Sequence, residues 1–389
     1  MRVLMVANLD WYLYNYRLAL AEAIRTEGHE VHLLGSEGEY LPRLRRLGFP
    51  CHSWKLSRQV SGPWRAVAEM RRLTGVIAKV RPDLVHYFTV KPMLYGALVR
   101  RWCRHSYAVV NAPAGLWSAF SAPGLRSRPA RSLMRRWYGL ACNGPGVENI
   151  LQNPDDIQEL QQWRALRASN FHLIRGSGVS LQRFTATARA PSDAVVVLMA
   201  TRVNAFKGVR EFVAAARYLR ERELHVEFVL AGKPDRGLFG AIGEEEIAAW
   251  VEKKWIRYLG HREDMREVLQ SSDVVVLPSQ IREGVPRILI EAAAMGKPLV
   301  ATDVPGCREI VQEGLTGFLI PPGDALELAD RVARLAADAG LRARMGANGR
   351  RLVAAEFDES RVVQATLRVY EQAWRQLGDR VRAAAAASA

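Results

Sequence analysis

Long apolar runs are missing from this 389-residue sequence. A membrane-spanning helix needs roughly 20 consecutive apolar residues, and no segment approaches that length. The apolar stretch 3–7 is too short for a secretory signal and predicts a first β-strand. Because 49% of the residues are hydrophobic, we expect a folded globular protein.

Cysteine is scarce, and its spacing excludes two kinds of stabilising site. The chain has four cysteines, which lie far apart at Cys51, Cys103, Cys142 and Cys307. We therefore expect reduced thiols in a cytoplasmic protein, without a disulfide framework or a zinc site. No Asp-x-Asp motif is placed to hold a divalent cation, so we expect no metal cofactor.

Acidic residues are few in the first half of the chain. Residues 1–190 contain 27 basic and 12 acidic side chains, whereas residues 191–389 contain 28 of each. The first half therefore carries the whole net charge of +15. Such a charge predicts an anionic partner, which could be nucleic acid, a membrane surface or a phosphorylated substrate.

Strand-like and helix-like segments alternate along the whole chain. This alternation predicts an α/β fold of two Rossmann-like, doubly wound parallel sheets that face each other across a cleft. We expect one domain over residues 1–185 and a second over residues 190–365. Residues 366–389 are expected to form a C-terminal helix that packs back toward the first domain. Near the N-terminus, residues 8–15 are expected to form a long aromatic loop before a helix at residues 16–27.

Residues 279–292 contain two glutamates close to a predicted helix start. A buried strand is expected at residues 274–277, and Pro286 lies where the following helix would begin. Glu283 comes just before this helix and Glu291 lies inside it. Two glutamates on a surface helix would be ordinary, but open α/β sheets bind their ligands at the carboxyl ends of strands. The segment is therefore a candidate site for an anion and a sugar.

A second loop adds two cations to this candidate site. Arg202 and Lys207 lie five positions apart, and Gly208 opens the next helix. Cations beside a helix N-terminus can neutralise a diphosphate. Because basic loops are commonly just solvated, this loop indicates a site only in combination with residues 279–292.

These two segments and residues 295–306 resemble family 4 retaining glycosyltransferases of the GT-B fold. Residues 86–92, 152–156 and 176–179 look like the subgroup that adds N-acetylhexosamines or similar sugars to undecaprenyl-diphosphate-linked acceptors. The resemblance covers nearly the whole chain. It implies a hexosyltransferase (EC 2.4 type) that uses a UDP-sugar and a lipid-linked saccharide acceptor in polysaccharide or glycan biosynthesis.

In that family the second domain binds the nucleotide sugar, and the first is implied to bind the acceptor. The resemblance implies that Arg202 and Lys207 neutralise the donor diphosphate and that Glu283 contacts the donor sugar. Glu291 would accept hydrogen bonds from the ribose. Fixed cations stabilise the charge that develops on a leaving diphosphate, and a carboxylate favours an oxocarbenium-like sugar. The other donor-side residues implied are Gly284, Val285, Asn204, Arg257 and Tyr258.

The first half departs from the family pattern at two places. Its first loop has aromatic residues where many members have glycines, and Ala114 stands where many have a histidine. A retaining reaction in which the leaving phosphate takes the acceptor proton needs no such base. The acceptor-side candidates are His86, Lys91 and Asn111, although a histidine that ends a buried strand is more often structural. Trp11, Tyr12 and Tyr14 could contact an acceptor or fill the mouth of the cleft.

A basic helix is expected at about residues 128–140. Cations with neighbouring aromatic residues suit docking on an anionic leaflet, whereas the alternative is a solvated helix with aromatic residues in the core. Docking would place the protein at the inner face of the cytoplasmic membrane. The residues concerned are Arg126, Arg128, Arg131, Arg135, Arg136, Trp137 and Tyr138.

Three other functions compete with the glycosyltransferase hypothesis. A sugar-nucleotide epimerase of the same fold would need an acid and a base that the sequence does not supply. A nucleic-acid binder would use the basic half but would leave Glu283 and Glu291 unexplained. A catalytically dead scaffold is suggested only by Ala114.

If the basic half docks on membranes, the protein should co-sediment with anionic vesicles and be released by salt, because salt screens charge attraction. Equal binding to neutral vesicles at high salt would contradict this prediction.

Overall fold

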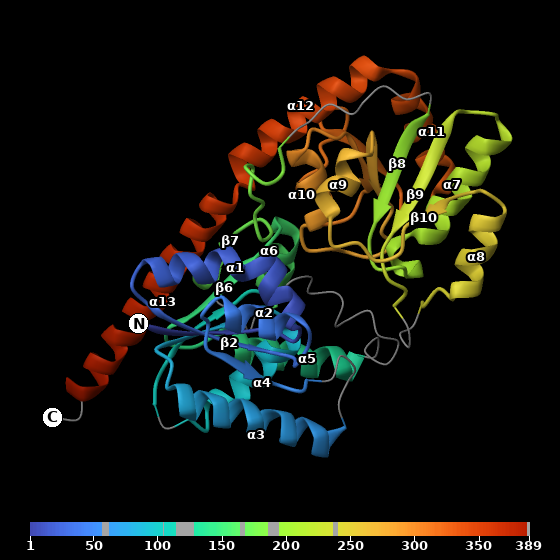
Figure 1. Cartoon of the computed structure of the whole chain (residues 1–389). Helices are drawn as coiled ribbons and strands as arrows, with labels where there is room; N and C mark the ends of the chain where they lie inside the picture. The colour runs from blue at the N-terminus through green and yellow to red at the C-terminus, as the bar shows by residue number, and fades with distance from the viewer. Residues whose placement is uncertain are drawn as a thin grey trace. The chain divides into compact units, whose positions relative to one another are not determined.

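Two parallel sheets, each within its own unit, organise the chain (Figure 1). The computed structural model describes residues 1–56, 62–103, 105–113, 128–163, 168–185, 194–235 and 240–386. The first unit comprises Met1–Ser177 and Arg361–Ala389, and the second comprises Gly178–Ser360. The expected α/β fold with two doubly wound sheets is confirmed.

The first sheet has the strand order β3-β2-β1-β4-β5-β6-β7, and all its pairs are parallel. Its central strands are apolar and buried, as parallel strands covered on both faces must be. The strands are β1 (Arg2–Val6), β2 (Glu30–Gly35), β3 (Cys51–Ser53), β4 (Leu84–Tyr87), β5 (Ala108–Asn111), β6 (Val147–Leu151) and β7 (Phe171–Leu173).

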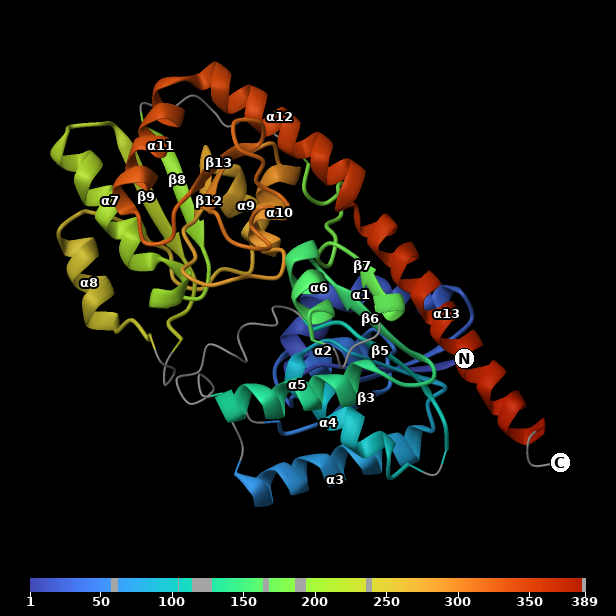
Figure 2. The same cartoon turned by 180° about the vertical axis from the view of Figure 1, so that it is seen from behind.

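Helices cover both faces of this sheet, because successive strand residues point to opposite sides. Val3 and Met5 face one core, with α1, α2 and α13, whereas Leu4 and Val6 face the other, with α3, α4, α5 and α6. Figure 2 shows α3, α4 and α5 from behind. The helices are α1 (Asp10–Thr26), α2 (Tyr40–Arg46), α3 (Pro63–Val80), α4 (Val90–Arg100), α5 (Arg128–Cys142), α6 (Pro154–Gln161), the 3-10 turn η3 (Ala168–Asn170) and α13 (Glu359–Ala386).

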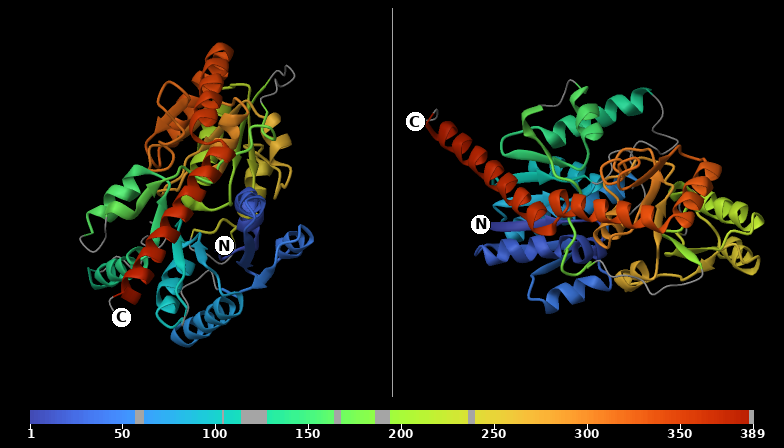
Figure 3. Two further views of the ribbon diagram at one scale, coloured as in Figure 1. Left: turned by 90° about the vertical axis from the view of Figure 1, so that its left-hand side faces the viewer. Right: turned by 90° about the horizontal axis from the view of Figure 1, so that it is seen from above.

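The C-terminal helix α13 packs on the core of the first unit (Figure 3). Val362, Val369, Tyr370, Ala373 and Leu377 recur at helical spacing and are buried against the first sheet and α1. The Tyr370 hydroxyl lies 2.6 Å from Nδ1 of His86 in β4. This helix therefore joins a core built almost 300 residues earlier in the sequence.

The second sheet has the order β10-β9-β8-β11-β12-β13 and is also parallel. Its strands are β8 (Val195–Ala200), β9 (Val226–Ala231), β10 (Arg257–Tyr258), β11 (Val274–Leu277), β12 (Leu299–Thr302) and β13 (Gly317–Ile320). Its helices are the 3-10 turn η4 (Ala205–Lys207), α7 (Val209–Glu221), α8 (Glu244–Glu252), α9 (Met265–Gln270), α10 (Arg287–Ala294), α11 (Ala325–Ala337) and α12 (Ala339–Glu356).

The expected loop at residues 8–15 is wrong, because α1 begins at Asp10. The Asp10 carboxylate accepts hydrogen bonds from the backbone amides of Tyr40 and Leu41, at 2.9 and 3.1 Å. These contacts with the start of α2 fix the first turn of α1. Trp11, Tyr12 and Tyr14 therefore lie on a helix and not on a loop.

Removing the Tyr370 side chain should destabilise the first unit. Truncation of a fully buried aromatic residue leaves a cavity, so Tyr370→Ala should cost about 3–5 kcal/mol. Hydrogen exchange of the β4 amides would measure this loss. The matched control is Arg375→Ala on the same helix, where the side chain is 76% exposed, and it should cost no more than about 0.5 kcal/mol. Equal losses would contradict the role of α13 in this core.

Candidate functional site

The candidate site lies on two loops that leave neighbouring strands. Within the second sheet β8 pairs with β11, and the sheet grows outward from these two strands in opposite directions. Open α/β sheets bind ligands at such a switch point, outside the carboxyl ends of the strands. The loops concerned are residues 201–208 after β8 and residues 278–286 after β11.

Backbone contacts hold these two loops together. The amide of Gln280 donates to the carbonyl of Phe206 at 2.8 Å. Gly208 has a φ of +80°, and a Cβ there would lie 1.8 Å from the carbonyl oxygen of Pro278. Only glycine tolerates both this conformation and this approach.

Lys207 and Glu283 meet across the two loops. Nζ of Lys207 lies 2.5 Å from Oε1 of Glu283, and the side chains are only 15% and 13% exposed. The hydroxyl of Ser279 donates to the same oxygen at 2.6 Å. Oε2 of Glu283 makes no hydrogen bond within the described part of the chain. One carboxylate oxygen of Glu283 is therefore held by Lys207 and Ser279, and the other is not.

Gly306 sets the position of the Glu283 loop from the other side. Its φ is +86°, and a Cβ there would lie 1.5 Å from the carbonyl oxygen of Gly284. The amide of Glu283 donates to the carbonyl of Pro305 at 3.1 Å. Substitution of Gly306 must therefore displace the backbone that carries Glu283.

Arg202 is paired with Asp235, whose side chain is buried. The guanidinium itself is 56% exposed, so it can still present donors to a ligand. Asn204 is buried, and its side-chain oxygen accepts the amide of Phe206 at 2.8 Å. The Asn204 side chain therefore caps η4, which carries Lys207.

Glu291 lies one turn along α10 from Arg287, and their side chains are 2.7 Å apart. Burial raises the pKa of Glu291, whereas the charge and hydrogen bond of Arg287 oppose that rise. The ion pair with Arg287 therefore holds the partly buried carboxylate of Glu291 in place on the first turns of α10. Gly284 and Val285, with their backbone amides, lie in the loop just before this helix, whose N-cap residue is Pro286.

Arg257 and Tyr258 form the short edge strand β10. Arg257 pairs with Glu227 at the surface, whereas the hydroxyl of Tyr258 donates to the carbonyl of Gly232 at 2.7 Å. A Cβ on Gly232 would lie 1.7 Å from the carbonyl oxygen of Thr201. Tyr258 therefore steadies a turn that touches the start of the Lys207 loop.

Two of the acceptor-side candidates lie in the core of the first unit. His86 and Asn111 are each 1% exposed. The Asn111 amide donates to the Ala141 carbonyl and the Asn149 side chain, both at 3.0 Å. The placement of Asn111 favours a structural role.

Lys91 is different, because it is partly exposed near the carboxyl end of β4. Its Nζ lies 3.0 Å from Oε2 of Glu69, which is 3% exposed. The buried glutamate holds the lysine in one place.

The structure places the expected basic helix at α5, starting at Arg128. Arg135, Arg136 and Trp137 are exposed, whereas Tyr138 is fully buried. Arg126 and Ala114 lie outside the described residues, as do the side chains of Arg128 and Arg131.

Sequence reasoning missed Ser279, Asp235 and the role of Gly306. Ser279 is a polar residue near the end of an apolar strand, which was the available signal. Gly306 was part of a recognised segment without an assigned role. Asp235 gave no signal, because its partner lies on another loop.

Within the part of the chain that the structure describes, no helix is long and apolar enough to cross a membrane. The same residues contain no group of three or more His, Cys, Asp or Glu side chains that could hold a metal ion. All four cysteines are free thiols.

Two family models match the chain, one in each half. Residues 2–152 match the model described as "Glycosyl transferase 4-like", and residues 194–338 match "Glycosyl transferases group 1".

Curated relatives match over most of the chain. A phosphatidyl-myo-inositol mannosyltransferase of Mycobacterium leprae is 35% identical over 360 residues, which cover 91% of each chain. The N,N'-diacetylbacillosaminyl-diphospho-undecaprenol alpha-1,3-N-acetylgalactosaminyltransferase of Campylobacter jejuni is 25% identical over 386 residues, covering 96% of this chain and 99% of that relative.

Solved structures share the fold. A Rickettsia africae glycosyltransferase has a TM-score of 0.75 at 18% identity, covering 96% of this chain and 98% of that chain. An Anabaena protein solved in complex with UDP and glucose has a TM-score of 0.73 at 20% identity, covering 95% and 99%. The expected GT-B fold is confirmed.

Substitution of Gly306 should cost more stability than substitution of a glycine with the same conformation and free space. Gly314 has a φ of +72°, and no atom lies within 4 Å of the position that a Cβ would take there, so Gly314→Ala should cost about 1–2 kcal/mol. Gly306→Ala should cost about 2 kcal/mol more, because the chain must also relieve a backbone clash. Urea unfolding would measure both, and equal losses would contradict the close approach.

Proposed function

Because the chain belongs to the family 4 (group 1) glycosyltransferases, we propose that its second unit binds a nucleotide sugar, with UDP-sugar as the donor class. The observation that carries this proposal is the contact of Lys207 with Glu283 at the switch point of the second sheet. A cation, a carboxylate and a helix start lie together there, which suits a ligand with both a diphosphate and a sugar.

The proposed reaction retains the anomeric configuration. The acceptor hydroxyl attacks the anomeric carbon from the face of the leaving group while the bond from that carbon to the diphosphate oxygen breaks. The hydroxyl proton passes to the leaving phosphate, so no protein base is required. Lys207 and Arg202 stabilise the charge that develops on the diphosphate.

Glu283 and Glu291 act on different parts of the donor in this proposal. Glu283 uses its unbonded Oε2 to face the sugar, where a carboxylate favours an oxocarbenium-like transition state. Glu291 accepts hydrogen bonds from the ribose, while the charge and hydrogen bond of Arg287 oppose the rise in its pKa that burial causes. The nucleobase of the donor would lie near Arg257 and Tyr258.

For the acceptor, we propose a polyprenyl-diphosphate-linked saccharide held by the first unit. The name of the Campylobacter relative includes such an acceptor, and residues 86–92 resemble the subgroup that uses undecaprenyl-diphosphate-linked acceptors. Lys91 is one cation of the first unit that would meet the acceptor diphosphate. The sugar would be an N-acetylhexosamine or a related hexose.

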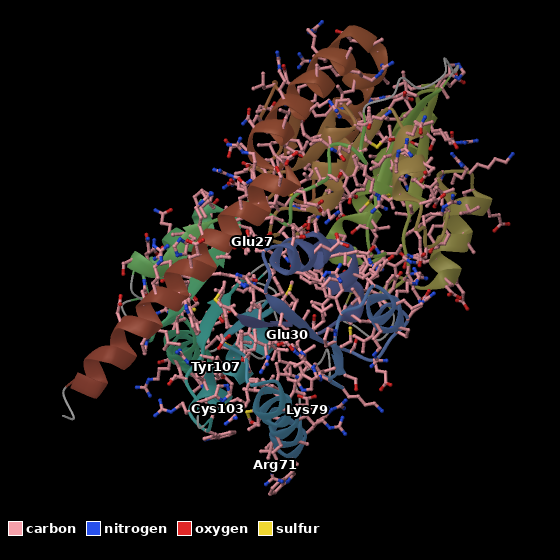
Figure 4. All side chains as sticks on the ribbon, turned by 60° about the vertical axis from the view of Figure 1, so that its left-hand side comes forward. Glu27, Glu30, Arg71, Lys79, Cys103 and Tyr107 are labelled. Carbon is pink, nitrogen blue, oxygen red and sulfur yellow. The ribbon has the colours of Figure 1, made fainter. Side chains whose placement is uncertain are left out.

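A membrane-facing surface fits a lipid-linked acceptor, so we place the protein at the inner face of the cytoplasmic membrane. Residues 40–147 contain 19 basic side chains and only two acids, Glu69 and Asp83. The exposed side of α3 carries Trp64, which is 87% exposed, together with Arg65, Arg71, Arg72 and Lys79. Arg71 and Lys79 are labelled in Figure 4. Cations around an exposed tryptophan suit an anionic leaflet.

Variants at the donor site should lose sugar transfer. Lys207→Ala and Glu283→Gln should each lower the transfer rate by about 10²–10³-fold, because each removes a group that acts on developing charge. A panel of UDP-sugars would be incubated with lipid-linked acceptors, and the products would be read by mass spectrometry.

The matched control is Arg210→Ala, which removes a surface cation paired with Glu246 in the same unit and should stay within about twofold of the wild type. Retained activity in both site variants would refute the site assignment. Calorimetry with UDP separates this function from nucleic-acid binding: tight, salt-sensitive DNA binding without UDP binding would favour the latter.

A further inference from the structure

The first sheet has a switch point of its own, between β1 and β4. These strands are neighbours, and the sheet grows from them in opposite directions. Helix α1 starts at Asp10, after a short connection from the end of β1 at Val6, and Phe88 follows the last residue of β4. The start of α1 and the end of β4 therefore lie at one edge of the sheet, where such sheets bind ligands.

A buried arginine reaches this edge. Arg17 is 6% exposed, and its guanidinium donates to the hydroxyl of Tyr12 at 2.9 Å. Its central carbon lies 4.7 Å from the ring centroid of Phe88 and 5.4 Å from that of Tyr12. Nε of Arg17 is buried without a hydrogen-bond partner in the described chain.

Arg17 has no carboxylate partner among the residues that the structure describes. Helix α1 carries two acids: Asp10 is buried and accepts hydrogen bonds from the amides of Tyr40 and Leu41, whereas Glu22 is exposed. The undescribed stretches contain a single acidic side chain, Asp193. A buried cation without a counter-ion is costly, so a negatively charged ligand would complete this site.

His86 supplies a second donor beside Arg17. Nδ1 of His86 contacts the hydroxyl of Tyr370, whereas its Nε2 is buried without a partner in the described residues. If Tyr370 donates to Nδ1, the hydroxyl proton has an acceptor, and the neutral ring then carries its proton on Nε2. Burial and the nearby charge of Arg17 lower the pKa of His86, which keeps the ring neutral. Both Arg17 and His86 pack on Phe88.

We propose that Arg17, with the Nε2–H of His86 and the hydroxyl of Tyr12, forms an oxyanion-binding site at the switch point of the first sheet. Its ligand is an anionic group of the acceptor, either a phosphate of the lipid linkage or a carboxylate of an acidic sugar. Arg17 is a binding and positioning residue, because it fixes the acceptor and takes no part in bond breaking. This proposal rests on the proposed acceptor role of the first unit.

Hydrogen exchange of the full chain tests the site without knowledge of the acceptor. Saturating UDP is present in every sample, so that the proposed diphosphate site of the second unit is filled. Inorganic pyrophosphate and malonate are then added separately, at an ionic strength matched with chloride. Binding should slow exchange in peptides that cover α1 and residues 84–89, and the probe that protects more strongly identifies the phosphate or the carboxylate class.

Variants show whether Arg17 causes this protection. Arg17→Met keeps most of the apolar stem and should abolish the protection, whereas Arg17→Lys keeps the charge and should retain part of it. The control Arg46→Met removes an exposed arginine of the same unit and should leave the protection unchanged. Protection that persists in Arg17→Met, or no protection by either probe in the wild type, would overturn the proposal.

Kinetics then connect the site to the acceptor. In Arg17→Met the KM for an anionic acceptor should rise by about tenfold or more, with an unchanged KM for the donor. An equal rise for both substrates would indicate a structural role and contradict the site. If pyrophosphate protects the wild type but no sugar transfer is found with any acceptor, the proposed function fails while the oxyanion site stands.

Discussion

The contact between Lys207 and Glu283 is the constraint on which the second unit's candidate site depends. It joins two loops that are far apart in sequence but leave neighbouring strands, and that adjacency exists only because β8 pairs with β11. A partly buried ion pair is costly unless hydrogen bonds complete it, and Ser279 completes this one on Oε1. The glycines at 208 and 306 let three backbone segments approach closely enough for the pair to form. The ion pair, the hydrogen bond from Ser279 and the close approach of the backbone at the two glycines therefore depend on one another.

The two sheets repeat one topology but place different chemistry at their switch points. In the second, a cation is neutralised by a carboxylate that can itself face a ligand. In the first, Arg17 lies among aromatic rings and a hydroxyl, with no acid beside it in the described chain. The same edge geometry therefore offers a balanced site in one unit and a net positive site in the other. This difference parallels the charge of the two halves of the sequence, since the excess of +15 lies wholly in the first.

Much of the fold could be predicted because buried parallel strands are apolar runs and helices end at glycine. Residues 274–277 and the helix that ends before Gly296 were predicted in this way, although the helix starts at Arg287, one residue after Pro286. Strand β6 was missed because Glu148 and Asn149 interrupt its apolar pattern. Both are buried nonetheless, since Glu148 contacts His172 and Asn149 bonds to the carbonyl of Cys142. Polar residues satisfied by distant partners do not look like a strand in sequence.

The candidate site was harder to predict than the strands, because the sequence does not show which partner a basic residue contacts. Arg202 and Lys207 were predicted together as phosphate ligands, yet one is paired with Asp235 and the other with Glu283. Arg17 lies in a stretch expected to be an ordinary first helix and attracted no functional assignment. What distinguishes these cations is the set of partners that the fold brings to each. Residues in contact can lie far apart in the sequence, as His86 and Tyr370 do, which are 284 residues apart. Which positive charges remain available for an anion is thus a property of tertiary structure, and it can be found only after every carboxylate has been matched to its partner.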